Sequence, residues 1–140
     1  SGERNLEEAR AAYRQAGVSA ELLPFIDDMA AAYAWADLVL CRAGALTISE
    51  LAAAGLGSIL VPYPYAVDDH QTRNAEYLVE AGAARLVPQR ELTASALSEL
   101  LRPLIEDRRQ LLSMAQAARG KAQLDAVERI ADACREVQRR

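Results

Sequence analysis

The sequence has only one histidine and two cysteines, which limits the kinds of site it can form. Cys41 and Cys134 lie far apart and form no CxxC pair, while His70 has no histidine neighbour. These spacings argue against a disulfide framework and against a histidine-based metal site. We therefore expect two reduced thiols in a cytosolic setting, no bound metal and no cofactor.

Long apolar runs and the common nucleotide-binding motifs are also missing. No apolar stretch reaches the roughly 20 residues that span a bilayer, and the most apolar segment, residues 29–41, is interrupted by Asp37. The sequence contains no GxGxxG, no GxxxxGK[ST] and no GxSxG. With only seven glycines in the chain, a phosphate site would have to be built from one glycine and the start of a helix.

Composition indicates a globular α/β domain with an acidic first half. The 140 residues suit one domain, and an apolar content of 51% is enough for a core. Residues 1–70 contain 4 basic and 10 acidic side chains, whereas residues 71–140 contain 12 and 10. Because the basic residues of the second half are interleaved with acids, we interpret them as a solvated helix surface and expect no nucleic-acid partner.

Helical periods alternate with short β-branched or leucine-rich runs, a pattern typical of a parallel sheet with helices on both faces. An aspartate, Asp27 or Asp28, is expected to cap a helix that ends at Trp35. Further helices are predicted over 5–15, 45–54, 70–80 and from Thr93 onward, with breaks near 102–103 and 120. Strands are predicted over 21–25, 37–41, 58–61 and 84–87. In such Rossmann-like sheets ligands lie beyond the carboxyl ends of the strands, where the loops 25–28, 42–47 and 63–71 are expected.

The most informative segment is residues 42–50, which connects a predicted strand to a helix through one glycine. The first backbone N–H groups of a helix have no partner within it and favour negative charge, so this turn predicts an anion site. Thr47 adds a hydroxyl, Arg42 a positive charge, and Glu50 can accept hydrogen bonds from neighbouring sugar hydroxyls. Together these groups suggest a diphosphate attached to a ribose.

Each of these residues also has a purely structural interpretation. Thr47 and Glu50 fit a capping box, in which the two side chains satisfy the helix start themselves. The Asp68-Asp69 pair is interpreted as a helix cap rather than an acid/base pair. His70 has no predicted partner for general-base work, so a polar contact with a ligand is favoured over catalysis. Gln71 and Asn74 share a helix face, with Asn74 expected to tie the preceding loop.

Four stretches together resemble the MurG family of bacterial peptidoglycan glycosyltransferases. They are residues 25–29, 34–37, 42–50 and 68–75, whose order and spacing match the family over roughly residues 20–85. The resemblance implies an inverting enzyme that transfers N-acetylglucosamine from UDP-GlcNAc to lipid I, the lipid-linked muramyl-pentapeptide, giving lipid II. It also implies a GT-B architecture, two Rossmann-like domains facing a cleft, with the donor held mainly by the second.

The resemblance assigns donor contacts to eight residues of this sequence. Ile26 would meet the uracil edge through its backbone, and Glu50 would bind the ribose hydroxyls. The other assignments are to the diphosphate (Ala45, Leu46 and Thr47), to the GlcNAc hydroxyls (His70 and Gln71), and to the turn or the phosphate charge (Arg42).

The resemblance also implies which parts of the enzyme lie elsewhere. We expect residues 1–140 to be a partial carboxyl-terminal domain, without its first βα unit and without the acceptor-binding domain that would supply the catalytic base. The full-length protein would bind lipid I and associate peripherally with the cytoplasmic face of the inner membrane, serving cell-wall synthesis and thereby cell shape and division. Two positions depart from the family, Gly57 in place of a usual proline and Tyr65 in place of a common histidine, and Gly57 is expected to loosen the strand entry.

Three other functions remain open from the sequence. The chain could be the donor-binding subunit of a split GlcNAc transferase, which co-purification with a membrane partner would favour. It could be a non-catalytic nucleotide-sugar-binding module, against which the intact Thr47, Glu50 and Gln71 argue. It could also resemble UDP-GlcNAc 2-epimerases, although the motif at 42–50 fits the glycosyltransferases better.

Overall fold

The computed structural model describes residues 3–65 and 69–138, and the chain divides into two compact units. The first unit is Ser1–Ala34 and the second is Trp35–Arg140. Among the helices of the described ranges, none combines the length and apolar character needed to cross a membrane.

The first unit contains α1 (Glu3–Gln15) and most of α2 (Met29–Trp35). Asp28 caps α2, because its carboxylate accepts a hydrogen bond of 2.8 Å from the N–H of Ala31, as the sequence predicted. The predicted strand over 21–25 is wrong, since these residues form neither helix nor strand. A strand exists only where its backbone can bond to a neighbour, and the described residues supply none here.

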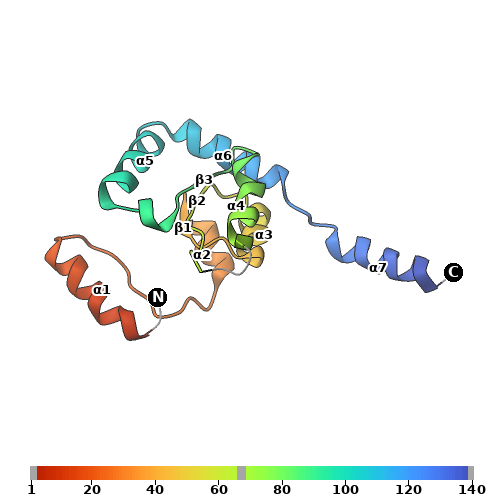
Figure 1. Cartoon of the computed structure of the whole chain (residues 1–140), viewed down its shortest axis with the longest axis horizontal. Helices are drawn as coiled ribbons and strands as arrows, with labels where there is room; N and C mark the ends of the chain where they lie inside the picture. The colour runs from red at the N-terminus through yellow and green to blue at the C-terminus, as the bar shows by residue number, and fades with distance from the viewer. Residues whose placement is uncertain (1–2, 66–68, 139–140) are drawn as a thin grey trace. The chain divides into compact units, whose positions relative to one another are not determined.

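The second unit is built on a parallel sheet of three strands, β1 (Val39–Cys41), β2 (Ser58–Leu60) and β3 (Ala84–Leu86), in the order β1-β2-β3 (Figure 1). This confirms the parallel α/β fold and three of the predicted strands. Every residue of β2 is buried. Because successive side chains of a strand point to opposite faces, both faces of the central strand are covered.

The crossover helices α3 (Ala45–Ala54) and α4 (His70–Val79) connect these strands and pack against each other (Figure 1). Leu51 of α3 and Leu78 of α4 are fully buried. Helix α3 ends where predicted, at Gly55, whose φ of 69° places it in the left-handed region. Its N–H donates to the carbonyls of Leu51 and Ala52, which closes the helix end.

The remaining chain forms η2 (Gln89–Glu91), α5 (Ala94–Glu106), α6 (Arg108–Gly120) and α7 (Ala126–Gln138). Thr93 caps α5 as predicted, accepting from the N–H of Ala96 at 3.1 Å. The predicted break near 102–103 is wrong, because Pro103 lies inside α5. The carbonyl of Pro103 accepts from the N–H of Asp107, and the Asp107 side chain caps α6. The chain therefore passes from α5 to α6 at Asp107. The break at Gly120 is confirmed.

Gly57 lies at the entry to β2, where a side chain would collide with α6. An added Cβ would lie 2.9 Å from the Cβ of Met114, closer than real Cβ contacts come. Met114 is itself only 3% exposed and cannot swing away. The structure thus gives this glycine a packing role between sheet and α6 that the sequence did not reveal.

We predict that Gly57→Ala lowers the free energy of unfolding by about 1–3 kcal/mol, because the new methyl group overpacks the contact with Met114. Urea denaturation followed by circular dichroism measures the change. Gly120→Ala is the matched control: nothing lies within 4 Å of its added Cβ, and it ends a helix. A Gly57→Ala protein as stable as Gly120→Ala would contradict the packing role.

Candidate functional site

The loops that follow the three strands emerge side by side at one edge of the sheet. Cys41 and Leu60 are register partners, as are Leu60 and Leu86. The ladder continues one step further, with the N–H of Val61 donating to the carbonyl of Cys41 at 2.9 Å. The loops beginning at residues 42, 61 and 87 therefore share the carboxyl edge, where ligands bind in sheets of this kind.

The start of α3 projects from this edge without a side-chain cap. Gly44 is the N-cap residue, with φ −66° and ψ 146°, and no side chain forms a capping hydrogen bond there. The first helical bond runs from the N–H of Ile48 to the carbonyl of Gly44 at 3.0 Å. The N–H groups of Ala45, Leu46 and Thr47 precede it and have no partner within the helix. This is the arrangement that favours an anion.

The capping-box interpretation of Thr47 and Glu50 is wrong. A capping box needs its threonine at the N-cap, but Gly44 occupies that position and Thr47 lies within the first turn of α3. Thr47 is half-buried, whereas Glu50 lies exposed one turn further along. The side chain of Leu46 is 81% exposed, so the helix start faces solvent.

Arg42 joins the loops at this edge through hydrogen bonds. Its guanidinium donates to the carbonyls of Val61 at 3.2 Å and Pro62 at 3.1 Å, and to the side-chain oxygen of Gln89 at 2.8 Å. It also lies over the ring of Tyr63, 5.5 Å from the centroid. The structure thus shows Arg42 supporting the neighbouring loops, while its predicted contact with a phosphate stays a prediction.

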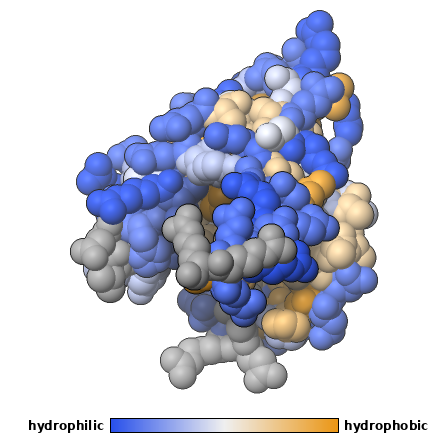
Figure 2. Space-filling model, turned by 90° about the vertical axis from the view of Figure 1, so that its right-hand side faces the viewer, coloured by the Kyte–Doolittle hydropathy of each residue, from blue (hydrophilic) through white to orange (hydrophobic). Residues whose placement is uncertain are grey.

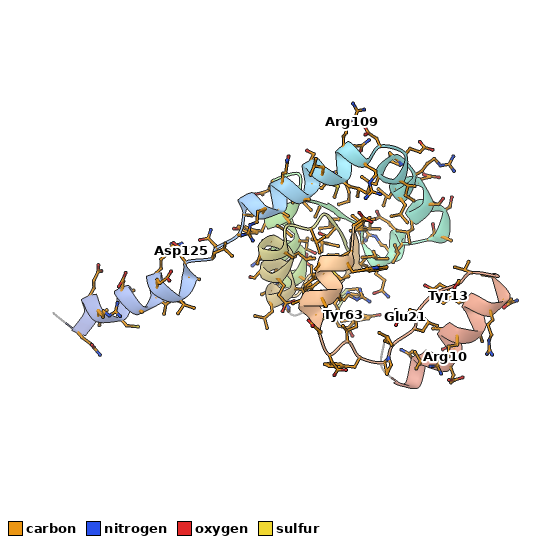
Figure 3. All side chains as sticks on the ribbon, turned by 180° about the vertical axis from the view of Figure 1, so that it is seen from behind. Arg10, Tyr13, Glu21, Tyr63, Arg109 and Asp125 are labelled. Carbon is orange, nitrogen blue, oxygen red and sulfur yellow. The ribbon has the colours of Figure 1, made fainter. Side chains whose placement is uncertain are left out.

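Two amides of α4 fix the turn before α3 and the loop after β2. Asn74 donates to the carbonyl of Ala43 at 3.1 Å, so it ties the turn that carries Gly44 rather than the loop that precedes α4. The side-chain oxygen of Gln71 accepts from the N–H of Tyr63 at 2.9 Å, at the position labelled in Figure 3. The predicted contact of Gln71 with a sugar stays a prediction.

The start of α4 differs from its predicted form. Asp69 is the N-cap residue, but its φ is 52° and its side chain forms no capping bond to the backbone. Its carboxylate instead accepts from the hydroxyl of Thr72 at 2.6 Å, so the predicted side-chain cap by Asp69 is wrong. Asp68 lies outside the described residues. His70 is the first residue of α4 and is exposed, and its sugar contact is untested.

Ile26 belongs to the first unit, where its side chain is 41% exposed, and its contact with uracil stays a prediction. Sequence reasoning missed Gln89 and Tyr63 as partners of Arg42. The parallel register could have indicated Gln89, because it follows the predicted strand 84–87 by two residues. No cluster of His, Cys, Asp and Glu side chains suited to a metal occurs in the ranges 3–65 and 69–138.

Cys41 lies at this edge with a half-buried thiol. Burial raises the pKa of its thiol to about 11, so the sulfur stays protonated at neutral pH. A cavity of about 470 Å³ opens beside it, lined by Leu40, Cys41, Arg42, Val61, Gln89 and Leu92. The chemistry of the edge therefore rests on hydrogen bonding and charge.

Comparison with known proteins matches residues 1–130 to the glycosyltransferase family 28 C-terminal domain. Two curated relatives are named UDP-N-acetylglucosamine–N-acetylmuramyl-(pentapeptide) pyrophosphoryl-undecaprenol N-acetylglucosamine transferase. The protein of Marinobacter nauticus is 62% identical over 96% of this chain and 37% of its own length. That of Nitrosococcus oceani is 59% identical over 97% of this chain and 38% of its own length.

A solved structure is similar throughout. The crystal structure of MurG from Acinetobacter baumannii matches with a TM-score of 0.90 and 43% sequence identity, covering 96% of this chain and 41% of that one. The chain thus spans less than half the length of the relatives it matches.

We predict that Arg42→Lys lowers the free energy of unfolding by about 1–3 kcal/mol, because one ammonium cannot satisfy three separated acceptors and buried carbonyls are left unpaired. Urea denaturation measures the loss. Arg102→Lys on the exposed surface of α5 is the matched control and should be neutral. If Arg42→Lys proves as stable as the control, the hydrogen bonds of Arg42 are not what holds the loops.

Proposed function

The chain belongs to the family of glycosyltransferase family 28 C-terminal domains, and from this we propose that it is the UDP-GlcNAc-binding part of an inverting N-acetylglucosaminyltransferase. The named activity of the relatives supports this proposal, as does the similarity to a solved MurG structure. In the proposed reaction, GlcNAc passes from UDP-GlcNAc to lipid I, giving lipid II for peptidoglycan.

The observation that carries the proposal is the uncapped start of α3. As the bond between the sugar and UDP breaks, negative charge grows on the diphosphate. The free N–H groups of Ala45, Leu46 and Thr47 point toward that charge and need no rearrangement to meet it. The carboxyl edge of a parallel sheet is where such a ligand is expected.

The other contacts complete the donor site. Glu50 binds the ribose hydroxyls, since a carboxylate accepts two hydrogen bonds from neighbouring hydroxyl groups. His70 and Gln71, at the first turn of α4, contact the GlcNAc hydroxyls. Ile26 meets the uracil edge through its backbone. Arg42 acts on the donor indirectly, by holding the loop after β2 in place.

The acceptor side of the reaction lies outside these 140 residues. A general base must remove the proton of the acceptor hydroxyl, and we propose that the rest of the enzyme supplies it together with the lipid I site. The enzyme would work as a peripheral protein on the cytoplasmic face of the bacterial inner membrane, where lipid I is presented. Its product would support cell-wall synthesis, cell shape and division.

We predict that Glu50→Ala in the complete enzyme weakens UDP binding by about 1–3 kcal/mol, the cost of losing hydrogen bonds to a charged group. Isothermal titration calorimetry with UDP and UDP-GlcNAc measures this. Glu106→Ala, an exposed carboxylate on α5, is the matched control. UDP-GalNAc should bind more weakly than UDP-GlcNAc in both control and wild type. Unchanged UDP affinity in Glu50→Ala would remove this residue from the site.

We also predict that the 140-residue chain by itself transfers no GlcNAc and binds UDP-GlcNAc weakly or not at all. The reason is that the acceptor site and its base lie elsewhere in the proposed enzyme. A radiolabelled-donor assay with a soluble lipid I analogue tests transfer, with the complete enzyme as the positive control. Turnover by the isolated chain would show that the catalytic base lies within it.

A further inference from the structure

A second cavity, of about 540 Å³, lies between α3, α4 and the segment 121–126. One side of α3 lines this cavity, with Ala45, Ile48, Ser49, Ala52 and Ala53. Of the predicted donor residues only Ala45 borders it, and Thr47, Glu50 and Gln71 do not. Its volume falls within the range usual for small-molecule sites. The cavity therefore adjoins the proposed donor contacts at Ala45 and otherwise has a lining of its own.

Positive charge without a balancing carboxylate marks this cavity. Arg73 and Lys121 both line it, and none of its lining residues is acidic. Asp125 belongs to the segment between α6 and α7 (Figure 3), but it is not among the lining residues. Within the described ranges Arg73 forms no ion pair. Two like charges beside one cavity repel each other, and an anion between them removes that cost.

Lys121, the only lysine of the chain, is held in place at the cavity wall. Its ammonium lies 4.2 Å from the centroid of the Tyr77 ring. The Tyr77 hydroxyl donates to the backbone carbonyl of Lys121 at 2.8 Å. The same tyrosine thus fixes both the backbone and the charged end of this lysine, which lowers the entropy lost when an anion binds.

The rest of the lining is mainly apolar, with Ile48 and Ala52 buried in α3 and Leu124 64% exposed on the facing segment. Figure 2 shows hydrophobic patches interrupting a mostly hydrophilic surface on one side of the molecule. An inorganic ion would leave the apolar part of the cavity in water. A ligand that carries both an anionic and an apolar group matches both parts.

We propose that this cavity binds a small organic phosphate, with the phosphate on Arg73 and Lys121 and an apolar substituent against Ile48, Ala52 and Leu124. Guanidinium groups bind phosphate with two parallel hydrogen bonds, and lysine adds a point charge. Its lining shares only Ala45 with the proposed donor site, so it can be tested separately while UDP is bound.

The test is a titration of the complete protein with phenyl phosphate in the presence of saturating UDP, followed by calorimetry. We expect binding that Arg73→Gln and Lys121→Met each weaken by at least about fivefold, the loss of one charge-assisted hydrogen bond. Inorganic phosphate should bind at least about fivefold more weakly than phenyl phosphate, because it buries no apolar surface. Leu124→Ala should reduce that difference.

Arg102→Gln, an exposed charge on α5, is the matched control and should leave the affinity unchanged. Circular dichroism of each variant establishes that it is folded. Equal affinity for phenyl phosphate in Arg73→Gln, Lys121→Met and Arg102→Gln would overturn the proposal, and so would the absence of phenyl phosphate binding while UDP is saturating. Vesicles of phosphatidylcholine with phosphatidic acid distinguish the source: competition with phenyl phosphate that depends on Arg73 indicates a lipid headgroup, and its absence a soluble phosphate.

Discussion

The hydrogen bonds of one arginine connect the loops that follow all three strands at the carboxyl edge. Arg42 follows β1, accepts no bond itself, and donates to the loop after β2 and to Gln89 beyond β3. Strand pairing already brings these three loops to one edge, but pairing ends at Val61 and Val87. Beyond that point the main chain has no ladder to hold it, and the guanidinium takes over. The donor site that we propose rests on loops fixed in this way.

The helix start at Gly44 is likewise held by a side-chain hydrogen bond, from Asn74. The anion site that we propose there uses backbone N–H groups, and no side chain of the described ranges caps them. Asn74 contributes by holding the carbonyl of Ala43, one residue earlier, so that the turn keeps its shape while the following N–H groups stay available. Capping of α5 and α6 by Thr93 and Asp107 provides the contrast, since both helices use a side chain to satisfy the same groups.

The sequence predicted part of the local structure and little of the long-range contacts. Gly55, Asp28 and Thr93 ended or began helices as expected, whereas the side-chain cap by Asp69 did not form. The strand expected over 21–25 did not form, since apolar content cannot supply a pairing partner. Pro103 did not break α5, which continues to Glu106, and the carbonyl of Pro103 accepts from the N–H of Asp107 at the helix end. The partners of Arg42 lie 19 to 47 residues away, beyond the reach of any local pattern.

The contacts that secure the start of the loop after β2 are made to backbone atoms of the loop. Arg42 binds the carbonyl oxygens of Val61 and Pro62, and Gln71 binds the amide of Tyr63. The backbone at residues 61–63 is therefore held mainly through its own atoms, with one further contact from the Tyr63 ring to Arg42. Tyr65, 82% exposed, lies in the same loop. Exposed side chains at the rim of this edge can therefore be substituted while the hydrogen bonds to the backbone below them are kept.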